Sequence, residues 1–302
     1  MRLGKYRQLR ATIAIAFTVL LSPSISFAEH GGDRLIIDIG LKTWVATWQA
    51  PLLFVPTSAG TNAITTTPTI MTGPTLTAAL KTSDSPWFNH LFANFTYMTS
   101  AGDFDFNYSK VNQSGVSTTG AALPGTFIPF KSIKADRSDL NFIVGTNVYR
   151  GLGIFGGYFN SSQTLKFTQF TSPATSTATT STNVDRTIDA FIFGISASGD
   201  LSENLDFRGN LAGAAGSLKY TNLSPNAEPL IGWSSEVGLK LHGHFTRKFE
   251  PYLYLGFRVQ DYESQYKLTQ ATRLAGVNVT TTQTLSYQDL TYGPVFQIGA
   301  QF

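Results

Sequence analysis

The sequence contains no cysteine and little charge, and after one apolar run near its start it has no other long apolar run. Without cysteine, the chain has neither a disulfide framework nor a thiolate site for metal or nucleophilic chemistry. Charged residues make up only 14% of the 302 residues, and the composition is rich instead in aromatic, Thr, Ser, Gly and Asn residues. After the first 28 residues no apolar run approaches the roughly 20 residues that a membrane-spanning helix requires. The composition therefore excludes a helical membrane protein and is typical of strands with one apolar and one polar face.

Residues 1–28 have the pattern of an export signal. A positive segment comes first and contains Arg2, Lys5, Arg7 and Arg10. An apolar run follows over 11–21, and small residues in Ser26-Phe27-Ala28 suit cleavage before Glu29. The alternative is a retained membrane anchor, which the helix-breaking Pro23 disfavours. We expect residues 1–28 to be a signal peptide and residues 29–302 to form one domain.

The export signal carries the positive charge of the chain. The whole sequence has 22 Lys and Arg against 19 Asp and Glu, and four of the basic residues lie in residues 1–28. The remaining chain then has 18 basic and 19 acidic residues, a formal net charge of −1. This balance gives no reason to expect a nucleic-acid partner.

Apolar residues recur at every second position through long segments, which indicates β-strands rather than helices. In 231–245, for example, Ile231, Trp233, Val237 and Leu239 share one face, and polar residues including Glu236 occupy the other. These segments are longer than the five or six residues of a usual strand. Ten segments are predicted, at about 34–48, 69–81, 89–109, 135–149, 152–168, 184–198, 204–221, 229–246, 250–268 and 283–302.

The connections between these segments alternate between short and long, as in transmembrane barrels. Short turns are expected at 150–151, 199–203 and 247–250, and long loops at about 49–68, 111–134, 169–183, 222–228 and 269–282. The predicted fold is all-β, a closed antiparallel up-and-down transmembrane barrel of about ten strands. Eight or twelve strands remain open because Gly73-Pro74 weakens the second segment. A bulge near Gly102 would explain an apparent change of phase in the third segment.

The C-terminus resembles the closing strand of Gram-negative outer-membrane β-barrel proteins. That pattern has apolar residues at alternate positions and a final aromatic; Tyr292, Phe296, Ile298 and Phe302 fit it, and Ala300 departs mildly. The resemblance implies a bacterial outer-membrane location with both mature termini in the periplasm. It also implies contact with outer-membrane lipids and lipopolysaccharide, and with periplasmic chaperones and the barrel-assembly machinery, which reads the terminal strand. No narrower subfamily is indicated, and the oligomeric state stays open.

The inward faces of the predicted strands carry a nearly balanced set of charges, six basic and five acidic. They are Asp38, Lys42, Lys81, Arg137, Asp139, Asp206, Arg208, Glu236, Lys240, Arg258 and Asp289. Because a ten-stranded barrel is narrow, we expect these side chains to pair with one another and to fill the lumen. A short turn at 247–250 sets Glu236 nearly opposite Arg258, which we take as its preferred partner.

Aromatic residues near segment ends suit the interfacial girdles of a membrane barrel. The candidates are Trp48, Trp87, Trp233, Tyr252 and Tyr292.

The sequence predicts no enzyme, no cofactor and no metal site. The four histidines are His30, His90, His242 and His244, none of them near the rim where barrel hydrolases act. His242 and His244 share a strand face, but no third metal ligand is evident. The favoured hypothesis is a structural or surface-interaction barrel with a mostly filled polar lumen. The alternative is a narrow porin-like channel for small solutes, followed by a rim enzyme that acts on lipid or peptide.

Overall fold

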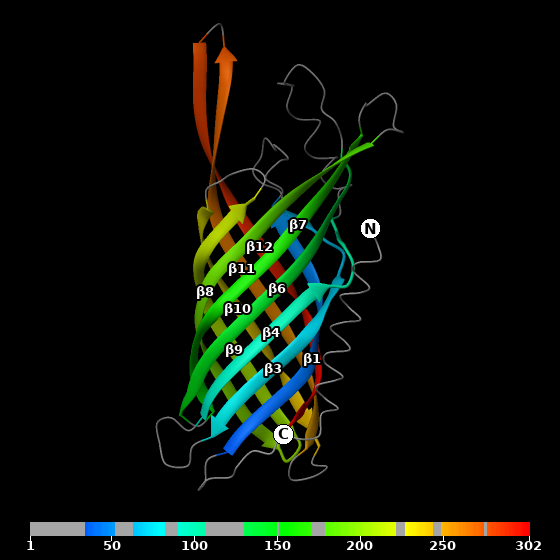
Figure 1. Ribbon diagram of the computed structural model, residues 1–302, viewed down its shortest axis with the longest axis vertical. Coiled ribbons are helices and arrows are strands. Elements are labelled where there is room, and N and C mark those ends of the chain that lie inside the picture. Colours follow the sequence, from blue (N-terminus) through cyan, green and yellow to red (C-terminus); the bar gives the residue numbers. More distant parts are fainter. Residues whose placement is uncertain are drawn as a thin grey trace.

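Ten long antiparallel strands form the wall of a barrel (Figure 1). The computed structural model describes residues 34–51, 63–81, 90–106, 130–149, 151–170, 179–221, 227–243, 249–274 and 277–302. The wall strands are β1 (Arg34–Pro51), β3 (Thr69–Lys81), β4 (His90–Ser100), β6 (Phe130–Tyr149), β7 (Leu152–Phe170), β8 (Thr179–Ser202), β9 (Leu205–Tyr220), β10 (Ala227–His242), β11 (Glu250–Leu274) and β12 (Val277–Gln301). Two short strands, β2 (Ala63–Thr65) and β5 (Phe104–Asp105), pair with β1 and β6. The expected signal peptide, residues 1–28, lies outside the described residues.

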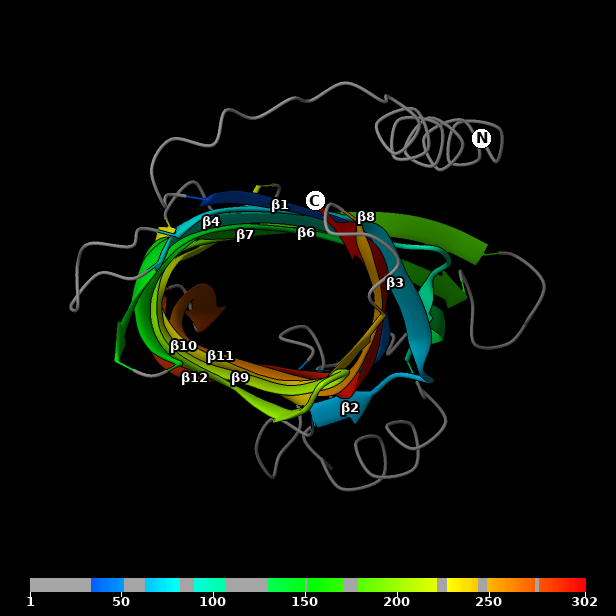
Figure 2. The same ribbon diagram turned by 90° about the horizontal axis from the view of Figure 1, so that it is seen from below.

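The barrel closes by pairing its last strand with its first. Each wall strand is antiparallel to the next one along the chain, and β12 then pairs with β1, with Ala300 opposite Ile39. At the end of this seam, the backbone N–H of Ile37 donates to Phe302 at 3.2 Å and that of Phe302 donates to Ile37 at 2.8 Å. Seen from below, the strands form a complete ring (Figure 2). The predicted closed, ten-stranded up-and-down barrel is confirmed.

Burial in the barrel is the reverse of that in a soluble protein. The outward side chains are large and apolar; Phe191 is 73% exposed, and Ile231 and Ile298 are each 65% exposed. Inward charged side chains are buried, with Arg137 2% and Asp289 0% exposed. Among the residues that the structure describes, no helix is long and apolar enough to span a bilayer. An apolar exterior around a buried polar interior is the arrangement that suits a sheet surrounded by lipid.

β3 is a full wall strand despite its Gly-Pro pair. Its pairing with β1 runs through Gly73 and Pro74 without a break, whereas its pairing with β4 skips both residues. Proline has no backbone N–H to donate, so the gap in the β3–β4 ladder lies where that donor would be missing. A side chain at Gly73 would place its Cβ only 1.8 Å from the carbonyl oxygen of Tyr97, so this close approach requires glycine.

The expectation of a bulge near Gly102, with a change in which residues face inward, is wrong. The segment from Thr99 to Phe104 is two residues longer than the part of β6 that it faces, because Thr99 pairs with Ser138 but Phe104 pairs with Ala135. An insertion of two residues preserves the alternation of faces. Phe104 therefore faces the lumen, as Ser100 does, and both residues are buried.

The two ends of the barrel differ as predicted, with one correction. The β6–β7, β8–β9 and β10–β11 connections lie at one end with the start of β1 and the end of β12; we call this the short-turn end and the other the loop end. At the short-turn end Gly151 has φ of 83°, a conformation that favours glycine in a tight turn. The loop expected at 269–282 is instead a hairpin. Its strands pair as far as Leu274 and Val277 and project beyond the rim (Figure 1).

The predicted aromatic girdle is only partly correct. Trp233 is 42% exposed on the outer face, and Tyr292 is half-buried there. Trp48 and Tyr252 are instead buried inside the lumen. On β1 Trp48 lies on the same face as Lys42, and on β11 Tyr252 lies on the same face as Tyr254. Trp87 lies outside the described residues. Position near a strand end indicated the level of these rings along the barrel but not the face that carries them.

Candidate functional site

The lumen is lined by side chains at alternate positions of every wall strand, and it contains most of the predicted charges. Seven of the eleven predicted residues are buried, Asp38 and Asp206 are half-buried, and Arg208 is the most exposed of those described. The side chain of Lys81 lies outside the described ones. The charges divide along the barrel axis into three groups.

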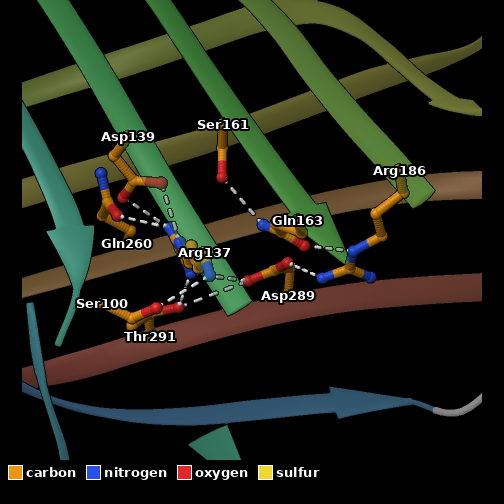
Figure 3. A network of polar contacts seen from close by, with 9 residues as sticks. All are labelled: Ser100, Arg137, Asp139, Ser161, Gln163, Arg186, Gln260, Asp289 and Thr291. Carbon is orange, nitrogen blue, oxygen red and sulfur yellow. Dashed lines mark hydrogen bonds and ion pairs between the residues drawn. The ribbon is translucent and has the colours of Figure 1, made fainter. Parts of the chain in front are cut away.

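The group nearest the loop end is centred on Arg137 of β6 (Figure 3). Its guanidinium donates to both oxygens of Asp139, at 2.9 and 3.0 Å. It also donates to Thr291 Oγ1 of β12 at 2.6 Å and to Gln260 Oε1 of β11 at 3.1 Å. β6 and β11 are five strands apart in either direction around the ring, so this side chain bridges opposite walls.

A second arginine joins the same network from β8. Arg186 donates to Asp289 Oδ2 at 2.6 Å and to Gln163, and Asp289 Oδ1 lies 3.7 Å from Arg137 Nη1. The charges of the two arginines are balanced by Asp139 and Asp289. We call these residues, together with Gln163, Gln260 and Thr291, the Arg137 network.

Trp48 forms an aromatic layer beside the Arg137 network. The guanidinium of Arg186 lies 4.8 Å from the centre of its ring and that of Arg137 lies 5.5 Å away. Phe104 and Phe106 pack on the same indole, each with ring centres 5.4 Å apart. Ring faces attract desolvated cations, so the network is held by cation–π contacts as well as by ion pairs.

The middle group consists of Lys42, Glu236 and Arg258. As the predicted register requires, Arg258 lies directly opposite Glu236. Its Nη1, however, is 4.0 Å from Glu236 Oε2, whereas Lys42 Nζ of β1 donates to the two Glu236 oxygens at 2.8 and 2.7 Å. The preferred partner of Glu236 is therefore Lys42, three strands away, and not Arg258. A cavity of about 90 Å³ lies beside this group.

The third group lines an open basin of about 530 Å³ at the short-turn end. His242 is held between two carboxylates, with Nε2 3.0 Å from Asp206 and Nδ1 2.7 Å from Glu250. Lys240 donates to Gln301 at 3.1 Å. The carboxylates lie on opposite sides of the imidazole, so these groups do not converge on one point, and no metal-binding cluster is found among the described residues.

Comparisons with known proteins return structures but no sequence family. No family model and no curated protein matches the chain. Among solved structures it is similar to the outer membrane protease OmpT from Escherichia coli, with 11% identity, a TM-score of 0.44, and coverage of 92% of this chain and 99% of that one. It is also similar to the beta domain of the Bordetella autotransporter BrkA, with 10% identity, a TM-score of 0.36, and coverage of 90% and 99%. For a Pseudomonas aeruginosa FadL homologue the identity is 8% and the TM-score is 0.28, with coverage of 89% of this chain and 90% of that one.

The closed wall, the apolar exterior and the buried polar lumen decide the type of molecule. The chain has the fold of an outer-membrane β-barrel. With TM-scores below 0.5 the similar structures carry no argument about this chain, and the role of this barrel has to come from its own lumen.

Sequence reasoning missed several lumen residues of this outer-membrane barrel, Arg186 above all. On β8 the inward neighbours Val184, Ile188 and Ala190 are apolar, as is the outward Phe191, so alternation is blurred there. One signal was available in the sequence. Extending the alternation of faces from the neighbouring strands β7 and β9 to β8 would have placed the charged Arg186 on the inward face.

The predicted assembly residues lie on the outer face of β12 or at its end. Phe296 and Ile298 are exposed, Tyr292 is half-buried, and the Phe302 ring lies 5.6 Å from that of Phe249. Their recognition by the assembly machinery stays a prediction.

Proposed function

We propose that this protein is a non-enzymatic outer-membrane barrel with a closed lumen, which serves a structural or surface-interaction role through its loop end. The observation that carries the proposal is the Arg137 network, in which buried side chains of β6 contact β11 and β12 on the far wall. A cation that crosses the lumen at this level would have to displace four mutually paired charges from one another. Such displacement leaves buried charges unpaired, which costs several kcal/mol.

A second barrier on the lumen axis supports closure. Lys42 crosses from β1 to Glu236 on β10, and both side chains are only 11% exposed. Trp44 lies beside this pair and is fully buried, with the Arg258 guanidinium 5.0 Å from its ring. A narrow porin-like channel would need a polar path through both levels, and the paired charges oppose it.

The non-enzymatic part of the proposal rests on His242. Both of its ring nitrogens face carboxylates, so neither is free to accept a proton from the hydroxyl of Ser202 in the same basin. The Arg137 network likewise offers no nucleophile, because each polar group in it is engaged by another. A rim enzyme on lipid or peptide is therefore the less supported alternative.

The orientation that we propose places the short-turn end, with both mature termini, in the periplasm and the loop end outside the cell. Short periplasmic turns and longer outer loops are the rule for such barrels. In this orientation the exposed apolar wall contacts outer-membrane lipids and lipopolysaccharide, and β12 is presented to periplasmic chaperones and the assembly machinery.

Conductance of the purified barrel in planar lipid bilayers tests the closed lumen. The wild type should show no stable open state, whereas the quadruple variant Arg137→Ala, Asp289→Ala, Lys42→Ala, Glu236→Ala should conduct because it removes the bridging side chains at both levels. The outward-facing Phe191→Ala is the matched control and should stay closed. A stable ohmic current through the wild type would instead establish the channel alternative.

Two further measurements establish whether the variants are folded and how the barrel is oriented in the membrane. Heat-modifiable gel mobility shows that each variant is folded; a folded quadruple variant that stays closed would refute closure by these paired charges. Because the chain has no cysteine, Ser181→Cys at the loop end and Glu203→Cys at the short-turn end report orientation. A membrane-impermeant maleimide should label only the first on intact cells; the reverse result would overturn the proposed orientation.

A further inference from the structure

The cavity beside Lys42 and Glu236 is enclosed by side chains of contrasting chemistry. One part of its wall is charged and polar, with Lys42, Glu236 and Arg258. Another part is apolar, with Phe155, Ile192 and Ala212. Its volume is about 90 Å³, which is room for several water molecules, since one water requires about 10–15 Å³ by this measure. The space therefore suits a molecule of a few non-hydrogen atoms with one polar end.

The charge in this wall is unbalanced. Lys42 donates to both oxygens of Glu236, so these two charges neutralise each other at 2.7 and 2.8 Å. The Arg258 guanidinium lies at 4.0 Å from the same carboxylate, outside hydrogen-bonding distance. The cavity wall therefore carries one net positive charge, located at Arg258.

Arg258 is also unsatisfied as a hydrogen-bond donor. The residue is only 6% exposed, and it stacks over Trp44 with its guanidinium carbon 5.0 Å from the ring centre. Within the described residues its N–H groups make no hydrogen bond, although a guanidinium carries five of them. In the described part of the chain no Arg258 nitrogen is among the fully buried side-chain atoms that lack a partner, so its N–H groups are accessible from the cavity and can donate to an acceptor that enters it.

A second unsatisfied group lines the same cavity. Asn141 Oδ1 is buried and has no hydrogen-bond partner in the described structure. The oxygen and nitrogen of an amide exchange places on rotation, so this side chain offers the cavity either an acceptor or two N–H donors. Turned to present its donors, Asn141 would assist Arg258 in holding an anion.

We propose that this cavity is a binding site for a short-chain monocarboxylate. The carboxylate accepts two parallel hydrogen bonds from Arg258, the geometry that a planar guanidinium favours. The short alkyl part packs against Phe155, Ile192 and Ala212. Inorganic anions match the charge of the site but leave this apolar wall uncovered, and long alkyl chains exceed a cavity of about 90 Å³.

Calorimetric titration of the folded wild-type barrel in detergent with sodium acetate, propionate, hexanoate and chloride tests this site. Propionate should bind saturably at one site per barrel, with hexanoate and chloride at least tenfold weaker. Arg258→Gln should weaken propionate binding at least about tenfold, because it removes a charge-assisted bidentate contact. Arg208→Gln, which removes an arginine from the basin instead, should leave binding unchanged.

A second variant keeps the test decisive if Arg258→Gln does not fold. Ala212→Leu leaves the charges in place but fills the apolar part of the cavity, so it should also abolish propionate binding. Absence of saturable binding to the wild type, chloride binding as strong as propionate binding, or undiminished binding by folded Arg258→Gln or Ala212→Leu would each overturn the carboxylate site. The titration measures binding and not current, so its result is independent of whether the lumen is closed.

Discussion

The substitution Asp289→Asn tests whether the Arg137 network stabilises the barrel. Asp289 is fully buried, and its two oxygens face both arginines, at 2.6 Å from Arg186 and 3.7 Å from Arg137. Asparagine has nearly the same volume, so the change creates no cavity. It removes one negative charge and leaves two buried guanidiniums with Asp139 as their remaining carboxylate.

The structure gives the size of the expected effect. Removing one partner of a buried ion pair costs about 3–5 kcal/mol, because the other charge is left uncompensated. Arg137 keeps both hydrogen bonds to Asp139, and Arg186 keeps its bond to Gln163. We therefore expect the low end of that range, a loss of about 3 kcal/mol in the free energy of unfolding.

Urea unfolding in lipid vesicles, followed by tryptophan fluorescence, measures this loss, since Trp48 lies 4.8 Å from the Arg186 guanidinium. The control is Asp261→Asn, a carboxylate on the outer face that accepts hydrogen bonds from Gln288 at 3.1 Å and should cost only about 1 kcal/mol. The double variant Asp289→Asn, Arg186→Gln should lose about 1 kcal/mol less than the two single losses together. Equal losses for Asp289→Asn and the control, or strict additivity, would refute the network as a stabilising unit.

Three other outcomes follow from the facing of the side chains. Val237→Lys places a charge in the middle of the exposed apolar face of β10 and should destabilise the barrel by about 2–4 kcal/mol. The lumen-facing Asn210→Lys should cost clearly less in the same urea assay, and equal costs would mean that the faces are misassigned. In a double-mutant cycle, Lys42→Met and Glu236→Gln should couple by about 1–3 kcal/mol, and additivity would show that the ion pair contributes nothing. Deletion of Phe302 should slow assembly and leave degraded periplasmic chain in cell fractions; wild-type yields of folded barrel would count against recognition of that residue.

Local sequence pattern was sufficient for the wall of the barrel. A period of two places alternate residues on opposite faces, so the outward Val237 and the inward Glu236 could be assigned without coordinates. Turn length sets the register between neighbouring strands, which is why Arg258 was correctly placed opposite Glu236. The same reasoning failed on β8, where both faces are apolar around Ile192, and where two inserted residues before Phe104 imitated a change of phase.

The sequence by itself thus determined the strands, their neighbours and the polarity of each face, because those properties depend on residues close together in the chain or joined by a short turn. Only the tertiary structure decided which side chains meet across the lumen. Lys42 and Glu236 are 194 residues apart and lie three strands apart around the ring. Arg137 and Gln260 are 123 residues apart and lie on opposite walls. Contacts of this kind depend on strand tilt and on the stagger with which the sheet closes, and these are properties of the whole ring rather than of any one segment.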